Sequence, residues 1–227
     1  MTTLQQFLLV APMLLFSMVA HEVAHGYAAL RQGDDTALML GRLSWNPLRH
    51  IDPWMTVILP VIMFFTLGFA FGGAKPVPVN PRNYRHYKRG DIIVSLAGIV
   101  TNLVLAVLMV PVVVGLGLLG RAAPALNDTM SIVQLMFAFG ITINLVLAGF
   151  NLMPIPPLDG SHVMKYLLPA RLALAYVRFA RFGFLLLVVI ISFGQPVLRA
   201  WMAPVFALNR MALGFLGPYV LHSPWTT

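Results

Sequence analysis

The sequence predicts an all-α membrane protein that crosses the bilayer several times and carries a small β-hairpin or sheet beside a metal site. Hydrophobic residues make up 59% of the 227 residues and charged residues only 10%, which is far more apolar than a soluble domain of this length. Five to six apolar segments approach the roughly 20 residues that a helix needs to cross a bilayer. In addition, a His-Glu-Val-Ala-His motif lies inside the first of these segments.

The apolar segments fill the chain, so we expect one membrane domain over residues 1–227. They cover residues 4–31, 54–71, 91–118, 131–153, 179–194 and 200–217. The first is too long for a signal peptide and lacks a cleavage pattern, so it is expected to stay as a helix. The last two form a C-terminal helical region over 171–217. Because the chain has no cysteine, a metal must be held by histidine nitrogen and carboxylate oxygen.

The distribution of lysine and arginine predicts which loops face the cytoplasm. The formal net charge is +8, but the basic residues flank apolar segments, which favours contacts with the lipid bilayer and argues against nucleic acid as a partner. They crowd into 72–90 and 165–181, so both stretches should be cytoplasmic and the amino terminus should face outward. We therefore expect a multi-pass protein of a prokaryotic plasma membrane, with its metal site toward the cytoplasmic side.

His21 and His25 lie four residues apart, and therefore about one turn apart on one face of the first helix. That spacing suits two ligands of a single zinc ion. Glu22, the only glutamate of the chain, lies between them and suits a general base. Ionisable side chains inside a membrane helix are costly unless they are paired or bound to metal, which argues against a purely structural role.

A catalytic zinc site takes three protein ligands and leaves a fourth position for water, so one more ligand is needed. Asp159 is the candidate, because it follows segment 131–153 within the motif 151–160, where prolines break the helix and free backbone groups near the bilayer. His162, three residues further on, could replace Asp159 as a ligand or support the site as a hydrogen-bond donor. We expect one Zn²⁺ ion per chain.

Five motifs resemble those of the site-2 protease family of intramembrane metalloproteases, in its short form without a PDZ insertion. They are His21-Glu-Val-Ala-His25, Gly41-Arg-Leu-Ser-Trp-Asn-Pro47, Gly73-Ala-Lys-Pro-Val-Pro-Val-Asn80, Ser95-Leu-Ala-Gly98 with Asn102, and Asn151 to Gly160. The resemblance implies zinc binding by the two histidines with Asp159, and activation of water by Glu22. It also implies a transmembrane protein as the substrate, cut within or near the bilayer. Ser44 and Trp45 depart from the usual threonine and aliphatic residue.

Three further side chains are candidates for contacts with the substrate or its oxyanion. The developing oxyanion needs a donor besides the metal, and Asn102, Asn151 and His162 lie near the motif segments. We favour Asn102. Each of these groups could instead make hydrogen bonds between helices.

Two short strands are expected within the region 38–80. Residues 38–45 precede turn residues, and 73–80 contains two prolines that remove N–H donors from one strand edge. A substrate helix must unwind before cleavage, so a free strand edge could pair with the unwound segment. The same strands could also form a simple structural hairpin.

Segment 54–71 is expected to enter the membrane and return. To share one zinc ion, the histidines and Asp159 must lie at similar depth, so the first helix and 131–153 run parallel with an odd number of crossings between them. Two apolar segments intervene, so one of them cannot span. As helices, 54–71 would reach about 27 Å and 91–118 about 42 Å, and Pro60 interrupts the shorter one.

Two other functions use the same residues. A divalent-metal transporter could hold its cargo with these ligands, but transporters usually show repeated halves, and this chain has no internal repeat. A non-catalytic zinc-binding protein could bind membrane helices without cutting them. The intact His-Glu-His set argues against that reading.

Overall fold

The computed structural model describes residues 1–67 and 72–225, and all regular structure within these ranges is helical. The α-helices are α1 (Thr3–Gln32), α2 (Thr36–Met39), α3 (Leu59–Leu67), α4 (Tyr87–Ala122), α5 (Asn127–Asn151), α6 (Asp159–Leu167), α7 (Ala170–Phe179), α8 (Gly183–Phe193) and α9 (Gln195–Leu216). Among the described residues, four helical stretches are long and apolar enough to cross a membrane: Thr3–Gln32, Tyr87–Ala122, Pro124–Asn151 and Ala170–Phe193. The predicted all-α architecture with several apolar helices of membrane-spanning length is confirmed.

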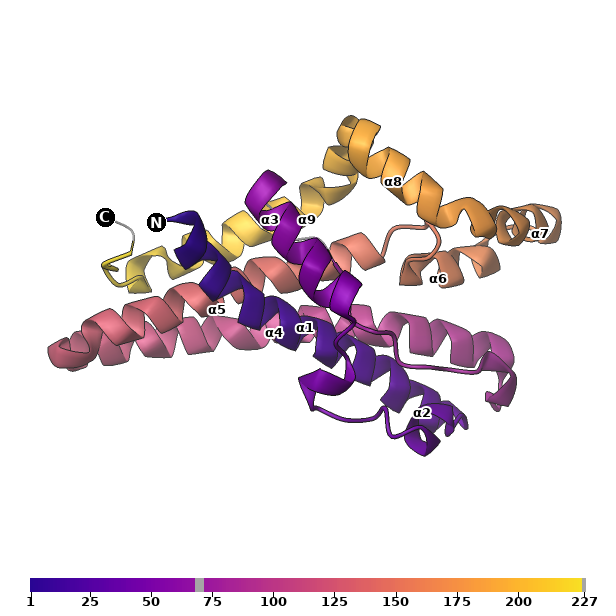
Figure 1. Ribbon diagram of the computed structural model, residues 1–227, viewed down its shortest axis with the longest axis horizontal. Helices are drawn as coiled ribbons and strands as arrows, with labels where there is room; N and C mark the ends of the chain where they lie inside the picture. The colour runs from indigo at the N-terminus through magenta and orange to yellow at the C-terminus, as the bar shows by residue number, and fades with distance from the viewer. Residues whose placement is uncertain (68–71, 226–227) are drawn as a thin grey trace.

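The centre of the fold is a bundle of α1, α4 and α5, with α9 against it. In Figure 1, α1 and α5 lead away from the end where both termini lie, and α4 runs back toward that end. Side chains from all four helices meet in one buried cluster, which comprises Met13, Met109, Val113, Ile141 and Leu216. Because α1 and α5 run in the same general direction, their carboxy-terminal parts lie at the same end of the bundle. The metal-site motifs occupy those parts.

The first helix has a defined signal at each end. Thr2 caps the amino terminus in a capping box with Gln5, and Gly33 ends the helix with φ +107°, in the left-handed region that glycine adopts without strain. Asp34 follows and is fully buried. Its carboxylate accepts hydrogen bonds from the Asn80 N–H at 2.6 Å and the Asn83 side-chain amide at 2.8 Å. The end of α1 is therefore fastened to the segment that leads into α4.

The two predicted strands are wrong for the described residues. In the first, residues 36–39 form one helical turn, which Gly41 ends at φ +62°. Residues 72–80 are extended, but their N–H groups pair with other partners: Lys75 with the His50 carbonyl at 2.7 Å and Val77 with Glu22 Oε2 at 2.8 Å. Prolines remove the donors of the opposite edge. With two donors missing from one edge and the N–H groups of Lys75 and Val77 on the other edge already paired, no ladder forms among the described residues.

Helix α3 continues a π-helical stretch, Pro53–Ile58, so the described part of this apolar helix runs from Pro53 to Leu67. The segment that follows the apolar helix is attached to the first turn of that helix, because the Gly73 N–H donates to the Met55 carbonyl at 3.0 Å. Thr56 Oγ1 donates to the Gly73 carbonyl at 2.7 Å. Residues 68–71, the end of the apolar segment 54–71, lie outside the described residues.

Replacing Asp34 by asparagine should destabilise the fold in a pH-dependent way. Burial raises the pKa of Asp34, but the hydrogen bonds from Asn80, Thr36 and Asn83 outweigh burial and hold that pKa below its ordinary value. The stabilisation is therefore complete above the unfolded pKa of about 3.9 and is lost as pH falls through the lower folded pKa. We expect Asp34→Asn to lower the free energy of unfolding by about 2 kcal/mol at pH 7.

Thermal denaturation of the purified protein in detergent, at pH 7 and at about pH 3, measures this difference. The gap between native protein and variant should narrow at the lower pH. Asp35→Asn is the matched control, because the neighbouring Asp35 is exposed and its side chain makes no capping hydrogen bond. An equal loss of stability in both variants would contradict the role of Asp34.

Candidate metal centre

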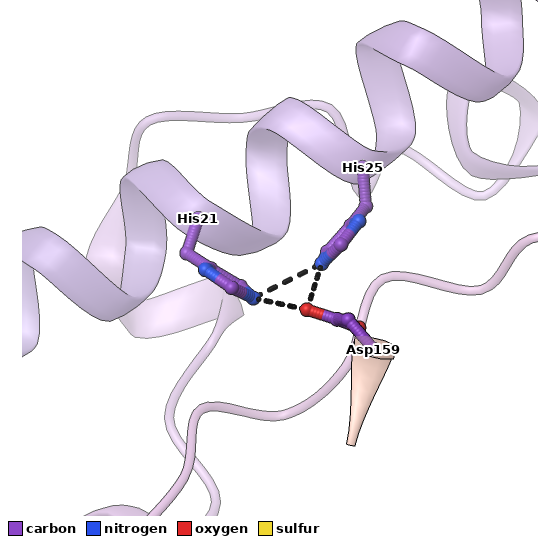
Figure 2. Close-up of side chains that lie close together, drawn as sticks. All are labelled: His21, His25 and Asp159. Atoms are coloured by element: carbon purple, nitrogen blue, oxygen red, sulfur yellow. Dashed lines mark hydrogen bonds and ion pairs between the residues drawn. The ribbon is translucent and has the colours of Figure 1, made fainter. Parts of the chain in front are cut away.

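His21, His25 and Asp159 converge on one point between α1 and the start of α6 (Figure 2). The two imidazole Nε2 atoms lie 3.0 Å apart. Asp159 Oδ2 lies 3.1 Å from His21 Nε2 and 3.3 Å from His25 Nε2. The histidines are buried, and Asp159 is partly buried. The structure therefore brings together the three residues that were predicted to bind one metal ion.

The opposite nitrogen of each ring is held by an acceptor on α4. His25 Nδ1 lies 2.7 Å from the Val94 carbonyl, and His21 Nδ1 lies 2.5 Å from Asn102 Oδ1. An oxygen without a proton requires the facing Nδ1 to be the donor, so each neutral ring presents an unprotonated Nε2. With both rings neutral, three acceptors would meet without a proton between them, and a bound cation would stabilise that arrangement.

The donor set and its spacing fit zinc. Zinc in proteins takes imidazole nitrogen and carboxylate oxygen at about 2.0–2.2 Å, and a tetrahedral arrangement at those lengths separates its ligand atoms by about 3.4 Å. The observed separations of 3.0–3.3 Å are close to that value. Both Nδ1 contacts follow the usual pattern in which the second nitrogen of a zinc-bound histidine donates a hydrogen bond that fixes the ring.

One face of α4 is shaped to receive the two imidazoles. Val94, Gly98 and Asn102 are spaced four residues apart, so they lie on one side of the helix. Val94 and Asn102 hold the rings, and Gly98 lies between them. A Cβ atom at Gly98 would come within 2.5 Å of His21 Nε2 and 2.6 Å of His25 Nε2. The absence of a side chain there leaves room for the metal-facing nitrogens.

Asp159 reaches the site because the chain turns sharply after α5. Prolines in residues 152–158 prevent α5 from continuing, and α6 starts at Asp159 itself. Gly160 lets α6 begin against the end of α5, since a Cβ there would lie 2.2 Å from the Leu152 carbonyl oxygen. Asp91 on α4 then holds α6 through Lys165 Nζ at 2.6 Å and the Tyr166 hydroxyl at 2.8 Å.

Glu22 lies beside the histidine pair and is partly exposed. Its Oε2 accepts a hydrogen bond from the Val77 N–H at 2.8 Å, which attaches the carboxylate to the extended segment 72–80. The prolines on both sides of Val77 have no N–H, so Val77 supplies the donor at this point of the segment. A carboxylate held through one oxygen keeps the other available as a proton acceptor.

Comparison with known proteins agrees with this geometry. The model of peptidase family M50 matches residues 9–193. The chain belongs to peptidase family M50. YwhC of Bacillus subtilis, named as a candidate zinc metalloprotease, is 35% identical over 78% of this chain and 77% of its own. Rip2 of Mycolicibacterium smegmatis, named in the same way, is 32% identical over 86% of this chain and 70% of its own. No solved structure matches significantly.

Membership of M50, the site-2 protease family, confirms the resemblance read from the motifs and the assignment as a zinc metalloprotease. The other predicted site residues of this M50 chain lie in different surroundings. Asn102 touches His21, as described above, whereas the Asn151 amide donates to Leu147 of its own helix at 3.0 Å. His162 is exposed and lies 3.5 Å from Asp91. Neither of these two faces the three converging atoms.

Sequence reasoning missed several groups that hold the M50 site. The Val94 carbonyl could not be found, because a backbone acceptor leaves no mark on the residue type. Ser17 and Asn144 could have been found: both are polar residues within apolar helices, and both are fully buried. Such residues are typical partners for hydrogen bonds between membrane helices.

Gly98→Ala should impair metal binding by the M50 chain. The added methyl group would overlap the space of both metal-facing nitrogens, so we expect zinc affinity to fall by about tenfold or more. Zinc content after dialysis against a chelator, measured by elemental analysis, tests this. Gly115→Ala on the same helix is the control, because a Cβ there would meet no described atom within 4 Å. Unchanged zinc retention in Gly98→Ala would show that the site is wider than described.

Proposed function

We propose that this M50 protease is an intramembrane endopeptidase that hydrolyses a peptide bond in or near the transmembrane segment of a membrane protein, using one zinc ion per chain. The observation that carries the proposal is the meeting of two imidazole Nε2 atoms, on a helix of membrane-spanning length, with the carboxylate of Asp159. Such a site inside an apolar bundle suits a substrate that is itself in the bilayer.

The chemistry follows from the residues around that point. His21, His25 and Asp159 would hold the zinc ion, which supplies Lewis acidity and lowers the pKa of a bound water when present. Glu22 accepts the proton of the attacking water and returns it to the leaving amine nitrogen. The Val77 N–H orients the Glu22 carboxylate during these transfers. Because the Asn102 side chain is occupied by His21 and Asn144, we assign it to holding the site and not to the oxyanion.

The depth of the site supports cleavage near one membrane surface. His21 lies 18 residues after Thr3, the first residue of α1, which is about 27 Å along the helix axis. The hydrocarbon core is about 30 Å thick, so the metal lies near the boundary where α1 leaves the membrane. The basic stretch 72–90 lies at that end too, which favours the cytoplasmic side of a plasma membrane.

Segment 54–71 then enters the membrane and returns. The hydrogen bond between Gly73 and Met55 supports this, because it places Gly73, which follows the apolar segment, at the level of the first turn of the helix. Even as one continuous α-helix, the 18 residues 54–71 would reach only about 27 Å, which is less than the hydrocarbon core of about 30 Å. Phe64 and Phe65 contact Phe7, near the start of α1, so α3 packs along the membrane-embedded half of that helix.

Glu22→Gln should separate catalysis from metal binding. Glutamine keeps the size of the side chain but cannot accept the proton, so we expect activity to fall by about 10²–10⁴-fold with zinc retained. Asp159→Ala should lose both zinc and activity. Cleavage of a panel of single-span membrane proteins in detergent, combined with elemental analysis, measures both properties.

The same panel decides the class of protein. Zinc-dependent cleavage that is absent in Glu22→Gln supports the protease. Failure to cut any substrate, together with zinc uptake into proteoliposomes, would favour a transporter. Full zinc occupancy in Asp159→Ala would remove that residue from the ligand set.

The topology predicts that residues before and after the re-entrant segment face the same side of the membrane. Asn46→Cys and Arg85→Cys place single cysteines at exposed positions in a chain that has none. An impermeant thiol reagent added to sealed vesicles of known orientation should label both from the cytoplasmic side only. Labelling of the two positions from opposite sides would be incompatible with a shared zinc ion at one depth.

A further inference from the structure

We propose that Asn144 is a positioning residue that fixes, through Asn102, which nitrogen of His21 faces the zinc ion. The inference rests on the proposed function, because it takes His21 as a zinc ligand. Asn144 lies on α5, whereas the two histidines lie on α1. It contacts His21 only through Asn102, so its effect on the metal is indirect.

A series of buried hydrogen bonds connects Asn144 on α5 to His21 on α1. The Asn144 side-chain amide donates to the Gly140 carbonyl at 2.8 Å and to Ser17 Oγ at 2.9 Å. Asn102 Nδ2 donates to Asn144 Oδ1 at 2.8 Å, and Asn102 Oδ1 lies 2.5 Å from His21 Nδ1. Ser17, Asn102 and Asn144 have no exposed surface.

The order of donors and acceptors in this series is set by a backbone carbonyl at the end remote from His21. The Gly140 carbonyl can only accept, so the NH₂ group of Asn144 must face it and its oxygen must face Asn102. That oxygen can also only accept, so Asn102 turns its NH₂ group toward Asn144. The oxygen of Asn102 therefore faces His21, and Nδ1 of His21 carries the proton.

The opposite orientation of the Asn102 amide would prevent His21 from binding the metal. If the Asn102 amide rotated by 180°, its NH₂ group would face His21 Nδ1, which would have to become an acceptor. The proton would then lie on Nε2, the atom that points at the metal, and a protonated nitrogen has no lone pair for zinc. In the native chain this rotation would bring two NH₂ groups of the asparagines together, at the cost of a buried hydrogen bond.

Removing the Asn144 amide should therefore weaken zinc binding although every zinc ligand is intact. In Asn144→Leu, which has a similar volume, the Asn102 NH₂ group keeps only its longer contact with the Ser17 carbonyl, at 3.5 Å, so the amide is held less firmly in its native orientation. We expect the zinc affinity to fall by about tenfold, as is typical when a hydrogen-bonding partner behind a metal ligand is lost. Asn144→Ala, which adds no bulk, should show the same change if the leucine variant does not fold.

Gln134→Leu is the matched control for a merely structural effect. Gln134 is another buried amide on α5, and it donates to the Val113 and Tyr219 carbonyls at 2.9 Å and accepts from the Leu221 N–H. Its removal costs hydrogen bonds between elements far from the metal. Gln134→Leu should lower thermal stability in detergent while zinc retention against a chelator series stays at the native level.

A double-mutant cycle tests the mechanism itself. Both oxygens of an aspartate accept, so in the Asn102→Asp background His21 Nδ1 stays the donor whichever way the carboxylate turns. In this background the carboxylate would face the Asn144 oxygen, which also only accepts, so adding Asn144→Leu removes that repulsion and should not lower the zinc affinity. An equal loss in both backgrounds would overturn the proposal, because the effect would not depend on the orientation of residue 102.

The outcomes distinguish this inference from the proposed function. If the native protein fails to retain zinc, or if His21→Ala retains it, the ligand assignment and the proposed function fail together. If native protein binds zinc and Asn144→Leu binds it equally well, only the positioning role of Asn144 is overturned.

Discussion

Two imidazole nitrogens and one carboxylate oxygen meet within 3.0–3.3 Å inside a bundle of apolar helices, an arrangement that a bound zinc ion would stabilise. The rest of the fold can be understood from this constraint. His21 and His25 are on α1 while Asp159 follows α5, so the two helices must reach the same depth. Their common direction, which Figure 1 shows, and the turn before α6 meet that requirement.

Polar groups near the metal are expensive in an apolar bundle unless each has a partner, and the helices supply partners in two ways. Backbone carbonyls of Val94 and Gly140 accept hydrogen bonds at fixed positions on α4 and α5. Side-chain amides transmit that fixed direction to His21. A backbone carbonyl can accept a hydrogen bond but cannot donate one. The Gly140 carbonyl therefore determines, through the amides, that Nδ1 of His21 carries the proton.

The sequence was informative where chemistry depends on side-chain type and spacing. Four-residue spacing of two histidines, a single glutamate and one aspartate after a proline-rich break were enough to predict the converging group. It was less informative about backbone pairing. Residues 73–80 had the composition of a strand, but whether an extended segment joins a ladder depends on which acceptors its N–H groups meet. Those acceptors, the His50 carbonyl and the Glu22 carboxylate, come from distant parts of the chain.

The prolines of the extended segment have a different consequence from the one their pattern suggested. In a strand, Pro76 and Pro78 would merely spoil one edge. Here they leave Val77 as the donor between them, and its N–H is directed at Glu22. Their rings also restrict φ on both sides, so the position of that N–H varies little. The segment thus orients a carboxylate of its own chain, which accounts for an extended conformation without a neighbouring strand.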